Sequence, residues 1–391
     1  MNDHITVLRQ LLQLLPLSEF DAFVGQHEAD KYVKNFSCRN HLTTLLYAQA
    51  SGKDSLRNIE TGLRAMGNSW YHLGLENISR NTLAHANANR PWNIYESLFY
   101  AMLKKCQEFS FGTASFSFQN ELYAIDSTTV DLCLTLFPWA HFRTAKGAIK
   151  LHTLFNVRSQ IPELVIVTDG KVADITAMRD MDLSGFPKGT IFVFDRGYTD
   201  YGFLWKIKEA GHFFVIRRKK GAQTVHLLGY DREITEKGVL KDENIAFVLP
   251  EATESYPEDL RLVTYHDEEH DQTYEFLTNI FDLSAKTVAD IYKSRWQIEL
   301  FFKWIKQHLK IKTFLGTSKN AVLTQIWIAM IYYLLLAWIK FQTRFRGSLH
   351  DLSILVCELL MHRSHFIDFL QATPKNVSKF KARDNPQLTL C

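Results

Sequence analysis

Short apolar runs rich in β-branched and aromatic residues recur between residues 121 and 216. A run of this length that is apolar throughout is typical of a strand buried in a sheet. A helical pattern over Asp200–Ala210 separates the last two runs, and strands that alternate with helices predict an α/β core with a mixed sheet. The runs are Glu121–Ser127, Lys150–Val157, Glu163–Val167, Thr190–Phe194 and His212–Ile216.

The segments on both sides of this core have different patterns. Residues 1–112 mix polar and apolar residues at helical spacing, which predicts an all-α N-terminal domain. Residues 113–345 would form the α/β domain, and short alternating runs within about 218–276 predict a β-rich insertion that is not part of the central sheet. Residues 346–391 predict a C-terminal helical segment and a basic tail, which we expect to be frayed.

The stretch Val322–Ile339 is long and apolar enough to be a candidate membrane span. Thr324 and Gln325 shorten its strictly apolar part to the fourteen residues Ile326–Ile339, which is nearer the length of a buried helix. The mean hydropathy of the chain is slightly negative, at −0.14. We therefore expect a core helix that covers the sheet, with a membrane protein as the less favoured alternative.

The five cysteines are scattered and form no C-x-x-C pair. This excludes a cysteine-based zinc module and a disulfide scaffold, and it fits a reducing compartment. The first twenty residues carry an early acidic residue and no cleavage-site pattern of a signal peptide. These features predict a cytoplasmic protein.

Charge is distributed unevenly along a chain whose formal net charge is only +3. Residues 293–312 carry six basic residues against Glu299 alone, whereas residues 251–275 carry nine acidic residues against Arg261 alone. Such asymmetry suggests one surface for a polyanion and another that is kept away from it. Two solvated faces of opposite sign are the alternative.

A polar helix is expected near the end of the N-terminal domain. Ser79 is a suitable N-cap for a helix over Arg80–Ala86. With the turn-like stretch before it, this helix resembles a loose helix-turn-helix variant that presents Arg80, Asn81 and His85 to a DNA groove. A small helical bundle with a polar surface helix explains the same residues.

Two aspartates stand where predicted strands end. Asp126 follows one apolar run and Asp195 follows another. A carboxylate at the carboxyl end of a buried strand is held rigidly at a crevice, which suits catalysis. Aspartate also ends strands simply because it starts turns, so position alone does not decide. Other aspartates near strand ends are Asp131, Asp169 and Asp174.

A helical stretch predicted over Asp282–Lys312 carries an unusual polar stripe. At about 100° per residue, four of its residues fall within about 60° of one another. They are Tyr292, Arg295, Glu299 and Lys306. An i,i+4 ion pair between Arg295 and Glu299 would explain two of them but not the tyrosine and the lysine. The stripe therefore places an acid among cations, facing something polar.

The spacing Tyr292-x2-Arg295-x3-Glu299-x6-Lys306 resembles the Y-x2-R-x3-E-x6-K signature of bacterial insertion-sequence transposases of the DDE class, in the insertion-sequence-four family. Ile125-Asp126-Ser127-Thr128 is similar to the first-aspartate strand of that family. Asp195-Arg196-Gly197-Tyr198 is similar to its second-aspartate motif. The order of segments also agrees, and the resemblance covers about residues 1 to 340.

The resemblance implies an RNase H-like catalytic domain whose metal-binding catalytic triad is Asp126, Asp195 and Glu299. Hard oxygen ligands without a His or Cys cluster suit Mg²⁺, for which Mn²⁺ would substitute. Two such ions about 3.5–4 Å apart would activate the attacking oxygen and stabilise the leaving oxygen of an in-line displacement.

The resemblance also implies contacts with double-stranded DNA. Arg295 and Lys306 would hold phosphates beside the scissile bond, and Tyr292 would contact the same backbone. Lys293, Lys310 and Lys312 would extend this basic groove. The predicted DNA-binding residues are Tyr292, Arg295, Lys306, Lys303, Arg80 and Asn81.

One departure from the family concerns the base that is flipped during cleavage. Family members that cut through a DNA hairpin stack a tryptophan of the insertion region on this base, but no tryptophan occurs between Val215 and Ala285 here. Other aromatic rings can stack on a base. Those available are Tyr230, Phe247, Tyr256, Tyr265, Tyr274, Phe276 and Phe281.

These observations together predict a DNA transposase that binds terminal inverted repeats, cleaves them with Mg²⁺ and joins the 3′ ends to target DNA. A homodimer on DNA is the simplest assembly that brings two ends together. We expect it in the cytoplasm, associated with the nucleoid. The alternatives are an inactive relative that occupies DNA without cutting it and a metal-dependent nuclease of the same fold.

Overall fold

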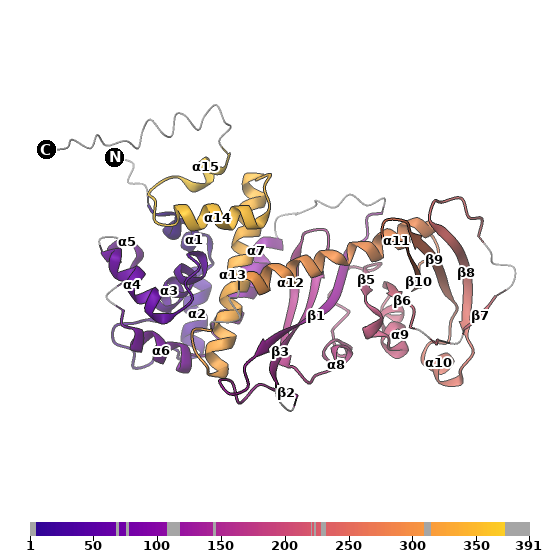
Figure 1. Cartoon of the computed structure of the whole chain (residues 1–391), viewed down its shortest axis with the longest axis horizontal. Helices are drawn as coiled ribbons and strands as arrows, with labels where there is room; N and C mark the ends of the chain where they lie inside the picture. Colours follow the sequence, from indigo (N-terminus) through magenta and orange to yellow (C-terminus); the bar gives the residue numbers. More distant parts are fainter. Residues whose placement is uncertain are drawn as a thin grey trace. The chain divides into compact units, whose positions relative to one another are not determined.

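The computed structural model describes residues 5–371 except 68–69, 76–77, 108–117, 144–145, 220, 223, 228–231 and 309–313. The chain divides into two compact units. One combines Met1–Phe109 with Trp304–Cys391, and the other is Ser110–Lys303. Figure 1 shows the first unit as indigo and yellow helices and the second as a sheet with its own helices. The predicted basic tail, from residue 373 on, lies outside the described residues.

The helical unit begins with seven helices and ends with three more among the described residues. Serine side chains accept a backbone N–H at several helix starts, and Ser79 accepts from the Thr82 N–H as the sequence predicts. The bounds are α1 Val7–Leu14, α2 Leu17–Gln26, α3 Cys38–Ala50, α4 Leu56–Ala65, α5 Trp70–Leu73, α6 Arg80–Asn89, α7 Asn93–Gln107, α13 Lys319–Thr343, α14 Leu349–Leu359 and α15 Phe366–Gln371.

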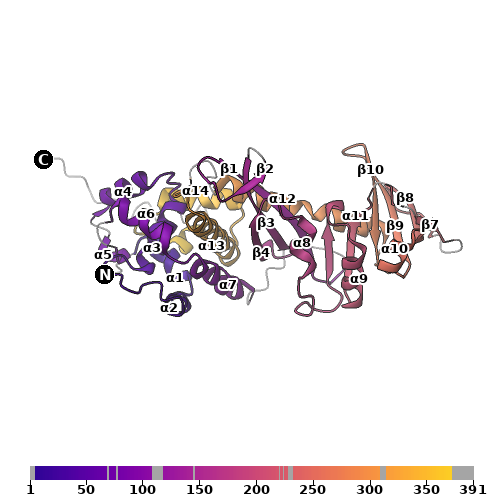
Figure 2. The same cartoon turned by 90° about the horizontal axis from the view of Figure 1, so that it is seen from below.

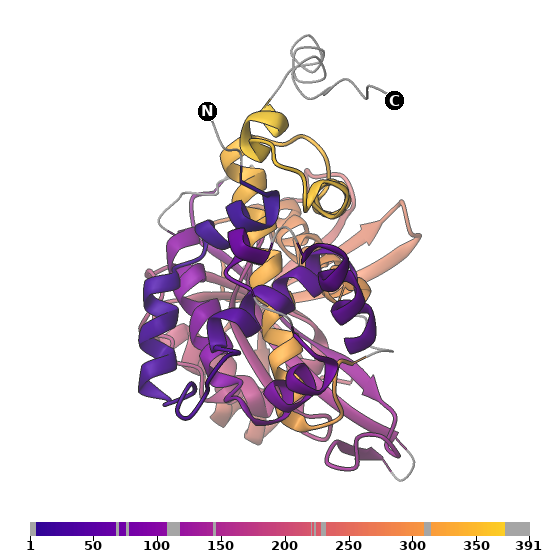
Figure 3. The ribbon, with the colours of Figure 1, turned by 90° about the vertical axis from the view of Figure 1, so that its left-hand side faces the viewer.

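The apolar helix α13 is the central helix of this unit. It packs against α3, α6, α7, α14 and α15, and Figure 3 shows it, in orange, running among the indigo helices. Its most apolar 18-residue window is 89% buried, and no other described helix is long and apolar enough to span a membrane. A buried helix was predicted correctly, but its expected place over the sheet was wrong. Because α13 is apolar on every side, it needs partners all round, and a surrounding set of helices supplies them.

The placement of α13 also changes the predicted domain boundaries. Residues 304–345, which we expected in the α/β domain, group with the helical unit. Helical periodicity reports that a helix has an apolar face but not which unit covers it.

A buried histidine connects three helices of the helical unit. The Nε2 atom of His41, on α3, lies 2.7 Å from Asn87 Oδ1 on α6, and its Nδ1 atom lies 2.7 Å from the Tyr95 hydroxyl on α7. An amide oxygen only accepts, so Nε2 carries the proton and Nδ1 accepts from the tyrosine. Complete burial lowers the pKa of His41 to about 3, with Arg90 adding to the effect. The folded unit therefore holds this histidine neutral.

The second unit is built on one sheet of ten strands among its described residues. The strands are β1 Leu122–Leu132, β2 His141–Arg143, β3 Lys146–Asn156, β4 Ile161–Asp169, β5 Ile191–Phe194, β6 Phe213–Arg217, β7 Thr224–His226, β8 Val239–Phe247, β9 Leu260–Asp267 and β10 Gln272–Thr278. The helices are α8 Asp174–Arg179, α9 Tyr201–Glu209, α10 Pro250–Ser255, α11 Ala285–Ser294 and α12 Trp296–His308, whose last residues, from 304 on, belong to the helical unit.

The strand order corrects the prediction of a separate insertion. The order is β2-β3-β1-β5-β6-β10-β9-β8-β7, and β4 also pairs with β3. Strand β10 pairs antiparallel with β6, with Thr278 opposite Val215. The segment 218–276 is β-rich as expected, but its strands continue the central sheet. The backbone groups along the free edge of β6 would otherwise lack partners, and β10 pairs with them.

The two faces of the sheet are covered differently. On one face an apolar cluster packs under α8, α9 and α10, with Ile125, Phe194 and Leu204 among its members. On the other face Phe155 of β3 contacts Phe301 of α12, with ring centroids 5.3 Å apart. Figure 2 shows α8 and α9 on one side of the strands and α12 behind them.

The neutral state of His41 predicts a specific pH dependence of stability. The pKa of His41 in the folded protein lies below its ordinary value near 6.5. The contribution of neutral, buried His41 to the free energy of unfolding is therefore complete above pH 6.5 and is lost as pH falls toward 3. The advantage of the wild type over His41→Gln in free energy of unfolding should shrink by about 2 kcal/mol between pH 7.5 and 5.0. Urea unfolding followed by circular dichroism measures both proteins, and parallel pH profiles would show that His41 is not held neutral.

Candidate active site

Two aspartates lie side by side where the parallel strands β1 and β5 stop pairing. The last pair between these strands joins Ile125 to Phe194, so Asp126 and Asp195 both stand one residue beyond it. Asp195 follows the end of β5 as predicted. Asp126 does not end its strand, because β1 continues to Leu132 along its antiparallel partner β3. The neighbouring strand β5 ends at this level while β1 continues, and the Asp126 side chain is 21% exposed.

The alternation of side chains places both aspartates on the face of the sheet that α12 covers. Tyr123, Ile125, Phe192 and Phe194 belong to the apolar cluster under α8 and α9. The next residue of each strand therefore points to the opposite face. Phe155 is on that opposite face as the partner of Ala124, and it contacts Phe301. The same helix carries Glu299.

The predicted helical stretch forms two helices that meet at Arg295. The Arg295 N–H donates to the Tyr292 carbonyl, and the Ile298 N–H donates to the Arg295 carbonyl, so one 3₁₀-type turn with helical backbone at Arg295 joins α11 to α12. Tyr292 lies on α11, where its ring packs on Phe276 of β10 with centroids 4.6 Å apart. The sheet thus contributes Asp126 and Asp195 to the cluster, and the helical stretch packed on it contributes Tyr292, Arg295 and Glu299.

The Arg295 guanidinium bridges two of the carboxylates. Its Nη1 donates to Asp126 Oδ2 at 3.0 Å and its Nη2 donates to Glu299 Oε1 at 2.6 Å. The side chain of Arg295 is 14% exposed, and its Nε has no hydrogen-bond partner among the described residues. The third carboxylate, Asp195, accepts from the Tyr292 hydroxyl at 3.2 Å. One guanidinium, one hydroxyl and the Ser127 backbone N–H, at 2.8 Å from Asp126, therefore donate to the three carboxylates.

Burial changes the acidity of two groups at this place. It raises the pKa of Asp126 to about 6, against the lowering effects of the Ser127 N–H and Arg295, while Glu299 and Asp195 add to the rise. Burial also raises the pKa of Tyr292 to about 12, so its hydroxyl is protonated and donates to Asp195. Strongly shifted pKa values at an open edge of a sheet are typical of functional sites.

The structure brings together five of the predicted residues and leaves others apart. Asp126, Asp195, Tyr292, Arg295 and Glu299 form the cluster just described. Lys303 and Lys306 lie further along α12 and are exposed, and Lys306 is in the part of α12 that belongs to the helical unit. Arg80 and Asn81 are exposed on α6 of the helical unit. Lys310 and Lys312 lie outside the described residues.

The alternative aspartates have other positions. Asp174, at the start of α8, accepts from Ser127 Oγ and pairs with Lys150 at 3.0 Å, on the face opposite Asp126. Asp131 is exposed near the end of β1, and Asp169 is exposed at the end of β4. Lys293 pairs with Glu269 at 3.3 Å, so part of the basic stretch contacts the acidic segment. The expectation that this acidic segment lies apart from the basic one does not hold at this contact.

The donor set of the cluster fits a hard divalent cation. Carboxylate oxygens are the ligands that Mg²⁺ prefers, and here three carboxylates lie around one guanidinium at a partly exposed edge. In the described part of the chain, only Asp267, Glu269 and His270 bring their ligand atoms all within 4.8 Å of one another. The carboxylates around Arg295 are therefore more widely spaced in this arrangement, in which the guanidinium supplies the positive charge.

An exposed tryptophan next to Arg295 in the sequence was not predicted as a functional residue. Trp296 directly follows Arg295 and is 57% exposed, and Leu300 one turn later is 45% exposed. Trp296 lies on α12, beyond the insertion region in which the family's tryptophan was expected. Three of the proposed rings, Phe247, Tyr256 and Phe276, are buried in the sheet unit, and Tyr230 lies outside the described residues.

Comparisons with known proteins agree on one class. A family profile for the transposase DDE domain matches residues 117–335, and one for a domain of unknown function (DUF4372) matches residues 3–76. This chain therefore belongs to the DDE transposase family.

Three individual relatives support this membership. The chain is 32% identical to y4zB of Sinorhizobium fredii, a protein named as a transposase, over 308 residues, covering 78% of this chain and 83% of the relative. It is 29% identical to the transposase named for insertion sequence element IS5377 of Geobacillus stearothermophilus, covering 69% and 70%. It is 24% identical to the transposase named for IS4SA of Synechocystis, covering 71% and 76%. The chain is a transposase of insertion-sequence type that acts on DNA.

The hydrogen bond from Tyr292 to Asp195 can be separated from the packing of the ring. Tyr292→Phe removes only the hydroxyl and should lower the free energy of unfolding by about 0.5–1.5 kcal/mol. Tyr292→Ala also removes the contact with Phe276 and should cost about 2–3 kcal/mol. Chemical denaturation of both variants measures these values, and equal losses would show that the ring contact contributes little.

Proposed function

We propose that this chain cleaves DNA at the ends of its element and joins the 3′ ends to target DNA, with Asp126, Asp195 and Glu299 as the metal-binding catalytic triad. The observation that carries the proposal is the bridge that Arg295 makes between Asp126 and Glu299. These two carboxylates are 173 positions apart in the sequence, and they share one guanidinium at the edge where β5 ends. Folding has gathered acids that repel one another, which structural stability alone does not require.

The core of the sheet supports an RNase H-like catalytic domain. Strands β4, β3 and β1 are antiparallel neighbours, and β1, β5 and β6 are parallel neighbours. In such α/β sheets, ligands bind outside the carboxyl ends of the parallel strands, where Asp126 and Asp195 lie. The spacing from Tyr292 to Lys306 further supports placement in the insertion-sequence-four family.

The triad would hold Mg²⁺, with Mn²⁺ as a substitute, through its carboxylate oxygens. Bound ions of this kind activate the attacking oxygen and stabilise the leaving oxygen of a phosphodiester. The residues of the chain have their own tasks. The Tyr292 hydroxyl orients Asp195. In the absence of a divalent ion, Arg295 neutralises Asp126 and Glu299. In the presence of such an ion, the Nη groups of Arg295, which here donate to Asp126 and Glu299, would be able to donate to a phosphate oxygen.

Further contacts would hold the DNA along the surface. Lys303 and Lys306 are exposed cations on the helix that carries Glu299, and Tyr292 lies one helix earlier. Arg80 and Asn81 are exposed on α6 and would contact the terminal repeats from the 1–112 segment. Identical subunits that join two DNA ends are most simply arranged as a symmetric homodimer. Such a protein would act in the cytoplasm, on the nucleoid.

The triad can be tested with two matched aspartates on one strand. Asp126→Asn should reduce Mg²⁺-dependent cleavage of an end-bearing duplex by about 100-fold or more, because it removes a ligand charge without changing shape. Asp131→Asn changes an exposed residue five positions further along β1 and should keep wild-type cleavage. Gel assays of cleavage and strand transfer measure both. Full activity in Asp126→Asn would remove this residue from the triad, and cleavage without joining would favour a nuclease.

Metal binding gives a readout that needs no DNA. An ion that binds only the folded protein stabilises it by RT ln(1 + L/Kd), where L is the free ion concentration, so the melting temperature rises as this concentration exceeds Kd. Millimolar Mn²⁺ should raise the melting temperature of the wild type and of Asp131→Asn, but much less that of Asp126→Asn or Glu299→Gln. An equal rise in all four proteins would place the ion elsewhere.

The exposed Trp296 is proposed to contact DNA bases beside the triad. Aromatic stacking on a base contributes about 1–3 kcal/mol to binding. Trp296→Ala should therefore lower the affinity of the protein for the cleaved end-bearing DNA roughly tenfold or more. The change should leave the melting temperature nearly unchanged, because the side chain is 57% exposed. The control is Leu300→Ala, a change in an apolar side chain of similar exposure that cannot stack. Equal losses in both variants would show that no stacking is involved.

A further inference from the structure

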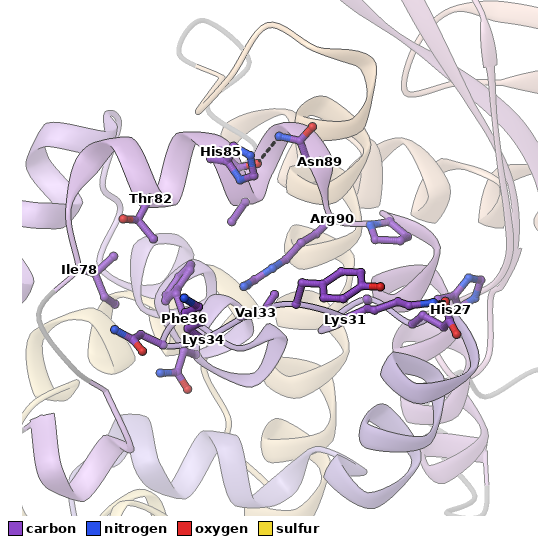
Figure 4. Close-up of a pocket in the computed structure, with 17 residues that line it drawn as sticks. His27, Lys31, Val33, Lys34, Phe36, Ile78, Thr82, His85, Asn89 and Arg90 are labelled. Atoms are coloured by element: carbon purple, nitrogen blue, oxygen red, sulfur yellow. Dashed lines mark hydrogen bonds and ion pairs between the residues drawn. The ribbon is translucent and has the colours of Figure 1, made fainter.

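The helical unit contains a cavity of about 680 Å³ that the proposed catalytic chemistry does not use. It lies between the connection from α2 to α3 and the helix α6, as Figure 4 shows. Its loop side falls within residues 3–76, which match a domain of unknown function. A pocket of this size is in the range that binds small molecules or single building blocks of polymers.

The cavity is lined by more positive than negative charge. Lys31, Lys34 and Arg90 contribute three cations, and Glu28 is the one carboxylate among the described lining residues. Glu28 already pairs with Lys31 at 2.6 Å. Two histidines, His27 and His85, add polar rings at the rim. Arg90 also lies 4.0 Å from Asp30, so among the described residues Lys34 is the lining cation without an ion pair, and the small excess of positive charge suits an anion.

Arg90 forms a fixed part of the cavity wall. Its side chain is only 8% exposed and its guanidinium lies 4.9 Å from the centre of the Phe36 ring. Its Nη1 donates to the Ser37 carbonyl at 2.9 Å, and Asp30 lies 4.0 Å away. In Figure 4 this side chain extends from the end of α6 toward the loop. The cation is thus held in place before any ligand arrives, which lowers the cost of binding.

Tyr32 is the most unusual residue of the lining. Its side chain is 92% exposed and its backbone has φ 63°, a left-handed conformation that costs a bulky residue free energy. Folding gains little from a ring that stays in water. Lys31 precedes it, with Nζ 5.9 Å from the ring centre, and Lys34 follows two residues later. A strained, exposed ring between two cations suits stacking on a base whose phosphates are held by lysines.

The opposite wall supplies hydrogen-bonding groups. Thr82, His85 and Asn89 follow one another at helical spacing on α6 and line the cavity. Their hydroxyl, imidazole and amide groups can pair with the edge of a nucleobase. A duplex presents a convex surface to such a hollow, whereas a single unpaired nucleotide can enter it. The shape therefore favours an unpaired nucleotide over paired DNA.

We propose that this cavity binds one unpaired nucleotide of a DNA strand, with its base on Tyr32 and its phosphates at Lys31 and Lys34. This inference rests on the proposed function, in that the ligand is DNA. It assigns to the helical unit a recognition of unpaired strands that is separate from metal-dependent cleavage.

The first test compares the binding of two DNA probes by the full-length protein. Tyr32→Ala should weaken binding to a single-stranded oligothymidylate of about twenty nucleotides roughly tenfold, because one base loses its stacking partner. The same change should alter binding to a fully paired duplex less than about twofold. Lys34→Gln should weaken the same complex and reduce its salt dependence. Lys104→Gln, an exposed lysine on α7 outside the cavity lining, is the matched control. Fluorescence anisotropy measures affinities, and melting temperatures equal to the wild type show that the variants fold.

A second test locates the contact directly. Photo-crosslinking with an oligothymidylate that carries 5-iodouracil should label the peptide that contains Tyr32, and polyglutamate should not compete. The proposal is overturned if Tyr32→Ala binds the single strand as tightly as the wild type, if Lys104→Gln loses as much affinity as Lys34→Gln, or if polyglutamate displaces the probe from this peptide. If Asp126→Asn retains cleavage while Tyr32→Ala loses single-strand binding, the assigned triad fails and the cavity assignment stands.

Discussion

The bridge that Arg295 makes between Asp126 and Glu299 is the interaction on which the candidate site depends. Three carboxylates at one edge of a sheet repel one another, and burial makes the charged form of Asp126 still less favourable. A guanidinium offers two parallel donor directions, so one side chain can satisfy a carboxylate from the sheet and one from the helix. The positive charge needed at this place is thereby present in the protein alone. A divalent cation that binds there would compete with the Arg295 guanidinium for the carboxylates of Asp126 and Glu299.

The fold supplies this arrangement through register and not through proximity in sequence. The parallel pairing of β1 with β5 ends at Ile125 and Phe194, which puts Asp126 and Asp195 in adjacent positions on one face. The 3₁₀-type junction at Arg295 leads into α12, whose Phe301 packs on Phe155 and whose Glu299 therefore lies over that face. A slip of one residue in either strand would turn its aspartate to the apolar cluster. The buried side chains of Phe192, Phe194 and Tyr123 therefore fix the register of β1 and β5 and keep both aspartates on the face of the site.

Much of this could be predicted from the sequence, and the failures have physical reasons. The strands and the capping Ser79 followed from local pattern, because these signals lie in the residues themselves. The choice of Asp126, Asp195 and Glu299 came from the resemblance to a family, because position alone left other aspartates open. The packing of α13 among the helices and the pairing of β10 with β6 could not be predicted. Periodicity shows that a helix has an apolar face or that a strand has a free edge, but not which element packs there. Asp126 was placed at the end of its strand because apolar character stops there, while β3 keeps the strand paired to Leu132. Trp296 and the cavity beside Tyr32 depend on exposure, which a single sequence does not show.

Asp126, Asp195 and Glu299 are proposed to act together as ligands of a divalent ion. Crystals grown with Mn²⁺ and an end-bearing duplex, measured at the manganese absorption edge, test it most directly. We expect anomalous density bounded by oxygens of all three carboxylates, with Arg295 displaced from Asp126 toward a phosphate. Density confined to Asp267, Glu269 and His270, with the Arg295 bridge intact, would contradict it.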